Sequence, residues 1–336
     1  MRAMAHAAVI GGGSWGTALA RVLADKGEDV RLWCKDPAHA EEIEVSRTNT
    51  RYLPGVTLPP SLRATSSAKE ALAGANIVVI VVPSHVLRAV TRELVQVGIP
   101  ASAPIVSATK GIENDSLMLM SEVLEQELPA AHHRFLTYLS GPSFAREVVR
   151  GMATAIVIAG HDERLVHELI HRFSSPRLRA YANSDVVGVE MGGALKNVIA
   201  IAAGAVDGLG LGHNARAAVI TRGLAEIARL AMAKGGSALT LAGLAGMGDL
   251  VLTCTGEASR NRTVGYELGR GRSLKDILAG MTQVAEGVRT AKSATDLGQK
   301  LGVDLPITNE VYRVLYEDKP VAVAVNDLMT RALVWE

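Results

Sequence analysis

The 336-residue chain has few aromatic side chains, only two cysteines and almost no net charge. Aromatic residues make up 4% of the chain and hydrophobic residues 48%, so the core must consist mainly of Ala, Val, Leu and Ile. A formal net charge of +1 gives no electrostatic reason to expect nucleic acid or an acidic membrane surface as a partner. The length exceeds what one ordinary core organises and therefore favours two domains.

The two cysteines, Cys34 and Cys254, lie far apart and lack the spacing of metal ligands, a pattern typical of reduced thiols in the cytosol. The first residues contain no hydrophobic region of the kind found in signal peptides. The stretch 189–206 is long enough to cross a bilayer, but it contains a glutamate, a lysine and an asparagine, which favours a buried helix. We therefore expect a cytoplasmic protein with no membrane insertion and no metal site.

In the first half of the chain, short β-branched runs alternate with amphipathic segments of helical period. The predicted strands are Ala7–Ile10, Asp29–Trp33, Ile77–Val82, Pro104–Ala108, Phe135–Leu139 and Thr154–Ala159. The predicted helices between them are Thr17–Ala24, His85–Val95 and Leu117–Glu127. This alternation predicts parallel strands joined by right-handed crossovers, which is the doubly wound α/β arrangement.

After about residue 185 the apolar residues recur at helical spacing and strand-like runs become rare. The predicted helices are 186–206, 215–233, 260–269, 274–280, 286–301 and 308–316. For the last of these, Pro306 followed by Thr308 as N-cap indicates the start. We predict a dinucleotide-binding domain over 1–185 and a mostly α-helical domain over 186–336 that binds substrate and carries the catalytic group.

The strongest cofactor signal is a glycine-rich turn after the first predicted strand. Gly11, Gly13 and Gly16 form a GxGxxG pattern that also opens a helix through Ser14 and Trp15. In this context the glycines allow a tight turn, close approach of a pyrophosphate and close helix packing. The pattern predicts a Rossmann-type nucleotide site, with the free N–H groups of the helix facing the anion.

The end of the second predicted strand bears on the choice of cofactor. Lys35 stands where NAD-preferring sites usually carry an acidic residue for the ribose hydroxyl. A cation there suits a 2′-phosphate and favours NADPH. Asp36, one residue further, keeps NADH open as an alternative.

One lysine stands in a stretch that otherwise indicates a buried helix. Lys196 lies within an Ala/Gly-rich apolar segment, where an ammonium group must be paired or lose its proton. We interpret it as a candidate acid/base group with a lowered pKa, although a lysine reaching the surface from a core helix would give the same pattern. Asp249, in another glycine-rich apolar setting, is the partner that we predict for it.

Further polar segments follow predicted strands or begin predicted helices. Val82-Pro83-Ser84, Lys110 and the run Gly141 to Ala145 come directly after strands, where doubly wound folds carry function. Ser259-Arg260-Asn261 looks like a capped helix start and predicts a phosphate site. The segment 284–287 is expected to hold a cofactor hydroxyl or simply to start a helix.

Together these segments resemble the NAD(P)-dependent glycerol-3-phosphate dehydrogenase family in its bacterial form. The matching pieces are VIGGGSWGTALA (9–20), VVPSH (81–85), ATKGI (108–112), SGPSFA (140–145), GGALKNVIAIAAG (192–204), TRGLAE (221–226), LAGMGDLVLTCTG (244–256), SRNR (259–262) and VAEG (284–287). They follow the family order over roughly the whole chain. The lysine segment and the GDL…SRN pair are specific to the family, whereas the glycine fingerprint is not.

The resemblance implies reversible reduction of dihydroxyacetone phosphate to sn-glycerol 3-phosphate, which supplies phospholipid synthesis, with Lys196 as general acid/base. It implies that the substrate is contacted by Lys110, Gly141, Ser143, Lys196, Asp249, Ser259, Arg260 and Asn261. It implies that the cofactor is contacted by the glycine turn and by Ser14, Trp15, Lys35, Lys110, Ala145, Arg260, Val284 and Glu286.

Two other hypotheses about the function stay open. A related NADP-dependent hydroxyacid dehydrogenase would use Lys196 in the same role on a carboxylate substrate. A catalytically silent NADPH-binding sensor would keep the glycine turn and need neither Lys196 nor Asp249. The Ala/Gly-rich helical domain would also suit a homodimer interface.

Overall fold

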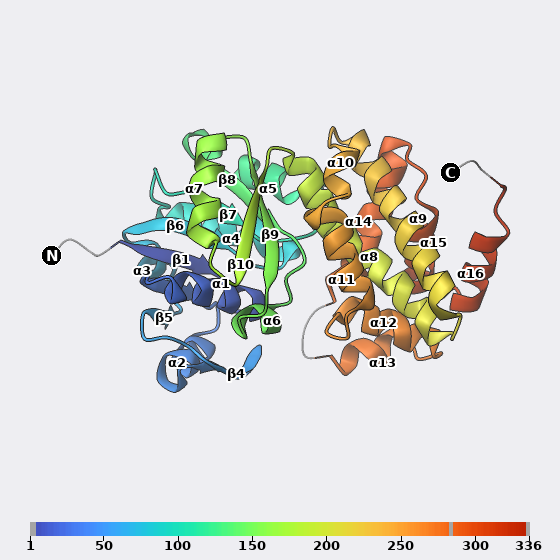
Figure 1. Cartoon of the computed structure of the whole chain (residues 1–336), viewed down its shortest axis with the longest axis horizontal. Helices are drawn as coiled ribbons and strands as arrows, with labels where there is room; N and C mark the ends of the chain where they lie inside the picture. The colour runs from blue at the N-terminus through green and yellow to red at the C-terminus, as the bar shows by residue number, and fades with distance from the viewer. Residues whose placement is uncertain (1–4, 282–284, 334–336) are drawn as a thin grey trace. The chain divides into compact units, whose positions relative to one another are not determined.

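The computed structural model describes residues 5–281 and 285–333, and the chain forms two compact units (Figure 1). The first unit contains Met1–Lys110 and Met120–Val186, and the second contains Gly111–Leu119 and Val187–Glu336. The short segment Gly111–Leu119 thus leaves the first unit and packs with the second, where the Ser293 hydroxyl donates to Ile112 O at 3.2 Å. Our predicted domain limits, 1–185 and 186–336, assigned this segment to the first domain.

The first unit is built around an eight-stranded sheet with the order β10-β9-β8-β7-β6-β1-β2-β5. Its strands are β1 (His6–Ile10), β2 (Val30–Trp33), β5 (Leu62–Thr65), β6 (Ala75–Ile80), β7 (Ile105–Ser107), β8 (Leu136–Ser140), β9 (Thr154–Gly160) and β10 (Leu178–Asn183). The central strands β1, β6, β7 and β8 are parallel neighbours, as predicted. Their side chains are buried on both faces, as expected when helices cover both sides of a sheet.

The pairing of β8 with β9 is antiparallel, so the prediction of an all-parallel sheet is wrong at this pair. β9 and β10 are parallel to each other and extend the sheet by a reversed pair. The strands β5 and β10, and the small hairpin of β3 (Thr48–Asn49) and β4 (Leu53–Thr57), were absent from the prediction.

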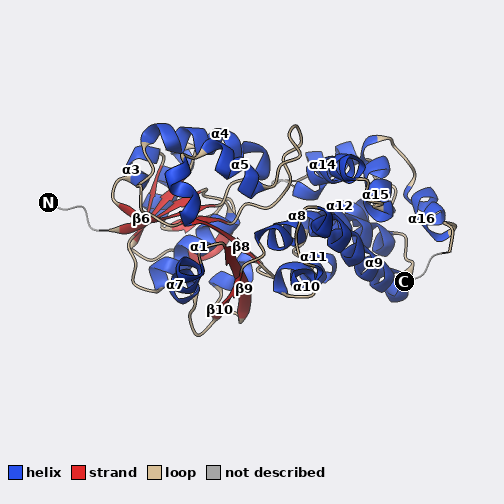
Figure 2. Cartoon of the chain, turned by 90° about the horizontal axis from the view of Figure 1, so that it is seen from above, coloured by secondary structure: helices blue, strands red, loops and turns tan. Residues whose placement is uncertain are grey.

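Helices lie on both faces of this sheet (Figure 2). On one face are α3 (Ala68–Leu72), α4 (Ser84–Val97) and α5 (Met120–Glu127), and on the other are α1 (Ser14–Asp25) and α7 (Glu163–Phe173). Shorter elements are α2 (Pro37–Ser46), α6 (Ala145–Val149) and the 3₁₀ helix η1 (Ala130–Phe135). The doubly wound prediction is confirmed for this unit.

The second unit is helical, as predicted. Its elements are α8 (Val186–Gly208), α9 (Gly212–Ala233), α10 (Ala238–Leu241), η2 (Leu244–Gly248), α11 (Asp249–Thr255), α12 (Arg260–Gly269), α13 (Leu274–Ala279), α14 (Glu286–Leu301), α15 (Pro306–Tyr316) and α16 (Val321–Met329). Within the described ranges, α8 is the one helix long and apolar enough to cross a bilayer, and 83% of its most apolar window is buried in the fold. This helix is the centre of the unit.

The start of α15 corrects one local prediction. Leu305, not Thr308, occupies the N-cap position, and Pro306 is the first helical residue. The first-turn N–H groups of Ile307 and Thr308 donate to the buried carboxylate of Glu226 on α9, at 2.6 and 3.0 Å. The carboxylate of Glu226, distant in sequence, therefore satisfies first-turn N–H groups that a local N-cap side chain usually satisfies.

Candidate active site

Four loops of the first unit lie side by side at the carboxyl ends of the strands of its sheet. Because β1, β6, β7 and β8 are adjacent and parallel, their carboxyl ends lie side by side. These ends lead into the glycine-rich turn, Val82-Pro83-Ser84, Lys110 and Gly141. β1 has β2 on one side and β6 on the other, so the glycine turn lies where the winding of the sheet reverses, the usual ligand position in this fold.

The geometry of the turn fits a bound pyrophosphate. Gly11 has φ +124°, and a Cβ there would lie 2.2 Å from Val81 O. A Cβ on Gly16 would lie 1.9 Å from Gly11 O, so helix α1 packs directly on the turn. A Cβ on Gly13 would meet no atom within 4 Å, and Ser14 and Trp15 follow as the first residues of α1. The turn is thus tight on one side and open beside the helix N-terminus.

Lys110 and Ser143 converge on one backbone carbonyl. Lys110 Nζ lies 3.5 Å from Gly141 O, and the Ser143 hydroxyl donates to the same oxygen at 3.2 Å. Gly141 has φ +124°, and a Cβ there would lie 3.0 Å from the backbone of Ile156. Ala145 is the first residue of α6. The two strand ends predicted to share a site are therefore brought together.

At the end of β2, Lys35 is exposed and Asp36 is already engaged. The Asp36 side chain caps α2 by accepting from Ala38 N at 3.1 Å, and it also pairs with Arg51 Nη1 at 3.3 Å. Each oxygen of this carboxylate therefore already has one partner.

In the second unit Lys196 and Asp249 form an ion pair. Lys196 is 9% exposed and Asp249 1% exposed. The predicted pairing of these residues is confirmed. The close approach of their elements needs Gly192, where a Cβ would lie 2.4 Å from Ala245 O in the turn of η2.

Thr253 contacts Asp249, and the sequence reasoning missed this contact. Its hydroxyl donates to Asp249 O at 2.6 Å and lies 3.5 Å from Asp249 Oδ1, which pairs with Lys196. The i, i+4 spacing from Asp249 on a helix was the available signal.

The predicted helix start at Ser259 is confirmed. The Ser259 side chain accepts from Arg262 N at 3.3 Å and caps α12, and Arg260 is exposed in its first turn. Arg262 and Arg216 both donate to Asp207 of α8, at 2.7 and 3.0 Å respectively. The Arg262 pair fixes the start of α12 against α8, which carries Lys196, and the Arg216 pair joins α9 to the same carboxylate.

Asn261 is largely buried and ties three helices together. Its Nδ2 donates to Asn197 Oδ1 at 2.9 Å, and its Oδ1 accepts from Gly287 N at 2.9 Å. Glu286, the first residue of α14, is therefore held close to α12 and α8. Val284, also predicted to contact the cofactor, lies outside the described residues.

Comparison with known proteins identifies both units. A family profile for the N-terminus of NAD-dependent glycerol-3-phosphate dehydrogenase matches residues 6–166, and the profile for the C-terminus of the same family matches residues 185–326. The chain belongs to this family.

Relatives of the dehydrogenase family are similar over nearly the whole chain. The glycerol-3-phosphate dehydrogenase [NAD(P)+] of Geobacter metallireducens is 56% identical, and that of Myxococcus xanthus is 54% identical, each covering 96% of both chains. The crystal structure of glycerol-3-phosphate dehydrogenase from Coxiella burnetii has a TM-score of 0.93 and 42% identity, and covers 97% of this chain and 99% of that one. A ketopantoate reductase from Ralstonia eutropha, with 17% identity and a TM-score of 0.56, shares the fold alone.

Membership in the glycerol-3-phosphate dehydrogenase family makes the chain an oxidoreductase with a nicotinamide cofactor and a small-molecule substrate. Among the residues that the structure describes, no group of three or more His, Cys, Asp or Glu side chains is arranged to hold a metal ion.

Proposed function

We propose that the protein catalyses the reversible NAD(P)H-dependent reduction of dihydroxyacetone phosphate to sn-glycerol 3-phosphate and thereby supplies glycerophospholipid synthesis. The observation that carries the proposal is the Lys196–Asp249 pair, nearly excluded from water in a chain whose relatives carry this enzyme name. A buried, charge-paired lysine is the kind of group that exchanges a proton with a reacting oxygen.

The substrate phosphate is assigned to the N-terminus of α12. Ser259 caps this ten-residue helix, and Arg260 adds a guanidinium in its first turn. Helix N–H groups and a planar guanidinium both favour a phosphate dianion. In the first unit, Lys110, Gly141 and Ser143 are the other groups that we assign to the substrate.

The reaction requires the transfer of a hydride and of a proton, and different groups carry out the two transfers. A bound nicotinamide supplies or accepts the hydride at the substrate carbon. Lys196 donates the proton to the carbonyl oxygen during reduction and removes it from the hydroxyl in the reverse direction. Asp249 keeps Lys196 in place and compensates its charge, and Thr253 orients Asp249. Proton transfer from a positioned side chain contributes about 10² to 10⁴ in rate.

We further propose that NADPH is the preferred cofactor and that NADH also binds. Lys35 is exposed at the end of β2, and Asp36 is engaged by Ala38 N and Arg51. This leaves a net positive local charge where a 2′-phosphate would lie in a doubly wound fold. Ser14, Trp15, Ala145, Arg260, Val284 and Glu286 complete the cofactor residues that we propose.

The deciding experiment follows absorbance at 340 nm with dihydroxyacetone phosphate and with unphosphorylated dihydroxyacetone, with NADPH and NADH in parallel. Rapid oxidation with the phosphorylated ketone alone supports the proposal. Turnover of 2-oxoacids without phosphate would instead support a hydroxyacid dehydrogenase. Tight NADPH binding without turnover of any ketone would support a sensor.

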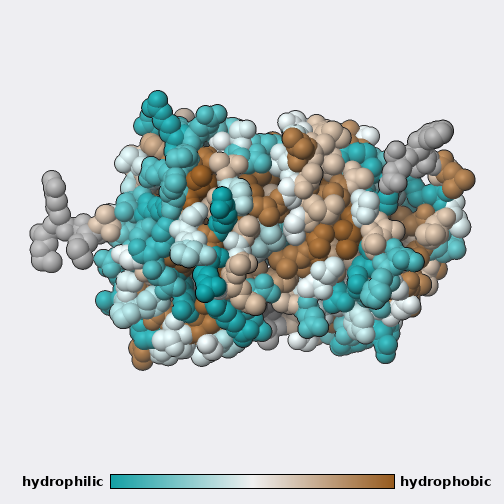
Figure 3. Space-filling view, viewed as in Figure 1, coloured by the Kyte–Doolittle hydropathy of each residue, from teal (hydrophilic) through white to brown (hydrophobic). Residues whose placement is uncertain are grey.

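We also propose a cytoplasmic homodimer. Apolar side chains gather over α9, α10 and α11 in Figure 3, and Met232, Leu239 and Val251 of these helices are 50%, 82% and 40% exposed. Sedimentation analysis tests the assembly: a monomer at micromolar concentration would contradict it. A Leu239→Lys variant should weaken the dimer if this surface is the interface.

A further inference from the structure

Asn49 is a completely buried asparagine beside the glycine-rich turn, and its amide has partners on every side. It lies in β3 and is 0% exposed. Its Nδ2 donates to Gly12 O at 2.9 Å and to Thr17 Oγ1 at 2.8 Å. Its Oδ1 accepts from Tyr52 N at 3.2 Å and lies 3.0 Å from His39 Nε2. A buried amide with this many partners has one orientation.

The bond to Gly12 fixes one peptide group of the turn. The Gly12–Gly13 peptide is planar and trans, as are all peptide bonds in the described chain, so its C=O and N–H point in opposite directions. Holding Gly12 O toward Asn49 therefore directs the Gly13 N–H away from Asn49. Gly12 packs directly against Cys34, since a Cβ there would lie 2.2 Å from Cys34 Sγ, whereas the space beside Gly13 is open.

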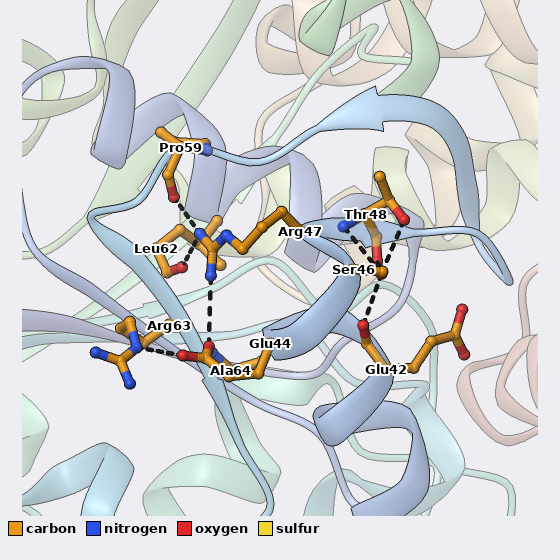
Figure 4. Close-up of polar contacts among 9 residues, drawn as sticks. All are labelled: Glu42, Glu44, Ser46, Arg47, Thr48, Pro59, Leu62, Arg63 and Ala64. Carbon is orange, nitrogen blue, oxygen red and sulfur yellow. Dashed lines mark hydrogen bonds and ion pairs between the residues drawn. The ribbon is translucent and has the colours of Figure 1, made fainter.

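The hairpin that carries Asn49 is secured at its base by separate contacts (Figure 4). The Arg47 guanidinium donates to Leu62 O at 2.5 Å and also to Pro59 O. The Ser46 hydroxyl lies 2.9 Å from Thr48 Oγ1. The hairpin therefore has anchors of its own besides the bond from Asn49 to Gly12.

We propose that Asn49 is a positioning residue for the cofactor: it orients the Gly12–Gly13 peptide so that the Gly13 N–H donates to the pyrophosphate. A free turn could rotate this peptide and present the Gly12 oxygen to the phosphate, which would repel it. Asparagine suits the task because it donates to Gly12 O and accepts from Tyr52 N through one rigid group. The inference rests on the proposed function only in taking a dinucleotide as the ligand.

The test measures binding directly, so that it does not depend on turnover. Asn49→Asp replaces the donor facing Gly12 O with an acceptor of the same shape. We expect the Kd for NADPH and for ADP-ribose, both of which carry a pyrophosphate, to rise about tenfold or more. The Kd for adenosine 2′-monophosphate, which lacks a pyrophosphate, should change less than about twofold. If the enzyme turns over, kcat at saturating NADPH should also stay within about twofold of wild type.

Two control variants separate positioning from loss of stability. His6→Leu removes a buried hydrogen bond, from His6 Nε2 to Ala71 O at 2.9 Å, at the other end of β1. Arg172→Ala removes a partly buried ion pair with Glu28, 2.6 Å long, and leaves the hairpin and Gly12 untouched. Both should bind NADPH within about twofold of wild type, even where their melting temperature falls.

Three results would overturn the inference. They are a folded Asn49→Asp with unchanged affinity for ADP-ribose, an equal loss of affinity for adenosine 2′-monophosphate, and an equal loss in either control. Should Asn49→Asp not fold, Thr17→Val removes one partner of the same amide and should weaken ADP-ribose selectively but by less. Failure of the proposed reaction is a distinct outcome, since it would appear as absent turnover with intact binding.

Discussion

Lys196 of α8 forms a buried ion pair with Asp249, the first residue of α11, which directly follows the π-helical turn η2. Two charges taken out of water are stable only when paired and hydrogen-bonded. Asp249 meets this condition through Lys196 and Thr253. The pair thus combines a proton-transfer group with a fixed counter-charge.

Replacing Lys196 should abolish most of the activity. We expect Lys196→Ala to lower kcat by about 10² to 10⁴ while the Kd for NADPH changes little. Leaving Asp249 buried without its partner should also lower the free energy of unfolding by about 3 to 5 kcal/mol. Steady-state kinetics, isothermal titration and urea unfolding measure the three quantities.

The double variant Lys196→Met/Asp249→Leu distinguishes the two roles of the pair. Replacing both charges with apolar side chains should restore much of the stability but none of the activity. Lys292→Met, which breaks an exposed pair with Asp296, is the matched surface control and should leave kcat unchanged. Normal turnover by Lys196→Ala would remove the lysine from the mechanism.

The exposed guanidinium of Arg260 should govern affinity for the substrate phosphate. We expect Arg260→Ala to raise the KM for dihydroxyacetone phosphate several-fold or more, because a charge-assisted contact is lost. At saturating NADPH, the residual rate with unphosphorylated dihydroxyacetone should not fall in parallel. Arg272→Ala is the control, because Arg272 lies just after α12 and pairs with Glu267 near the other end of that helix. An unchanged KM would move the phosphate to another site.

Lys35 should determine the choice between the two nicotinamide cofactors. Lys35→Ala should lower kcat/KM for NADPH about tenfold, the effect of losing roughly 1.4 kcal/mol, and should leave kcat/KM for NADH nearly unchanged. Arg63→Ala removes an exposed cation of neighbouring β5 and should not change the ratio. Equal losses for both cofactors would show that Lys35 does not discriminate between them.

Much of this architecture could be predicted because the local sequence pattern around the decisive residues is sufficient to indicate their structure. The central strands contain continuous apolar runs, as in Ala7–Ile10 and Ile77–Ile80, because both faces are buried. The pairing of Lys196 with Asp249 could be predicted because a buried carboxylate and a buried lysine each need a partner.

Other features depend on contacts that no local pattern contains. Strand β10 lies at the sheet edge, and its exposed and buried residues alternate at first. The β8–β9 pair is antiparallel because the chain reverses direction between these two neighbouring strands. Thr308 suggested a helix cap, but Glu226, far away in the sequence, accepts from its N–H and hydroxyl. Asn49 escaped notice for the same reason, since its partners Gly12 and Thr17 lie more than thirty residues before it.

Both cysteine thiols should resist alkylation in the folded protein. Burial raises the pKa of Cys34 and of Cys254 to about 12, compared with an ordinary thiol value of about 8.5. The reactive thiolate is therefore nearly absent at pH 8. Since the folded pKa is the higher one, the buried thiols stabilise the fold fully below about pH 8.5, and this stabilisation is lost as the pH rises toward 12.

Mass spectrometry after iodoacetamide at pH 8 should find neither thiol modified in native protein and both modified in urea. Cys34 Sγ packs against Gly12, so added NADPH should slow its labelling further at pH 9.5 and leave the rate at Cys254 less changed. Rapid native labelling of Cys34 at pH 8 would mean that the glycine turn opens far more often than this packing allows.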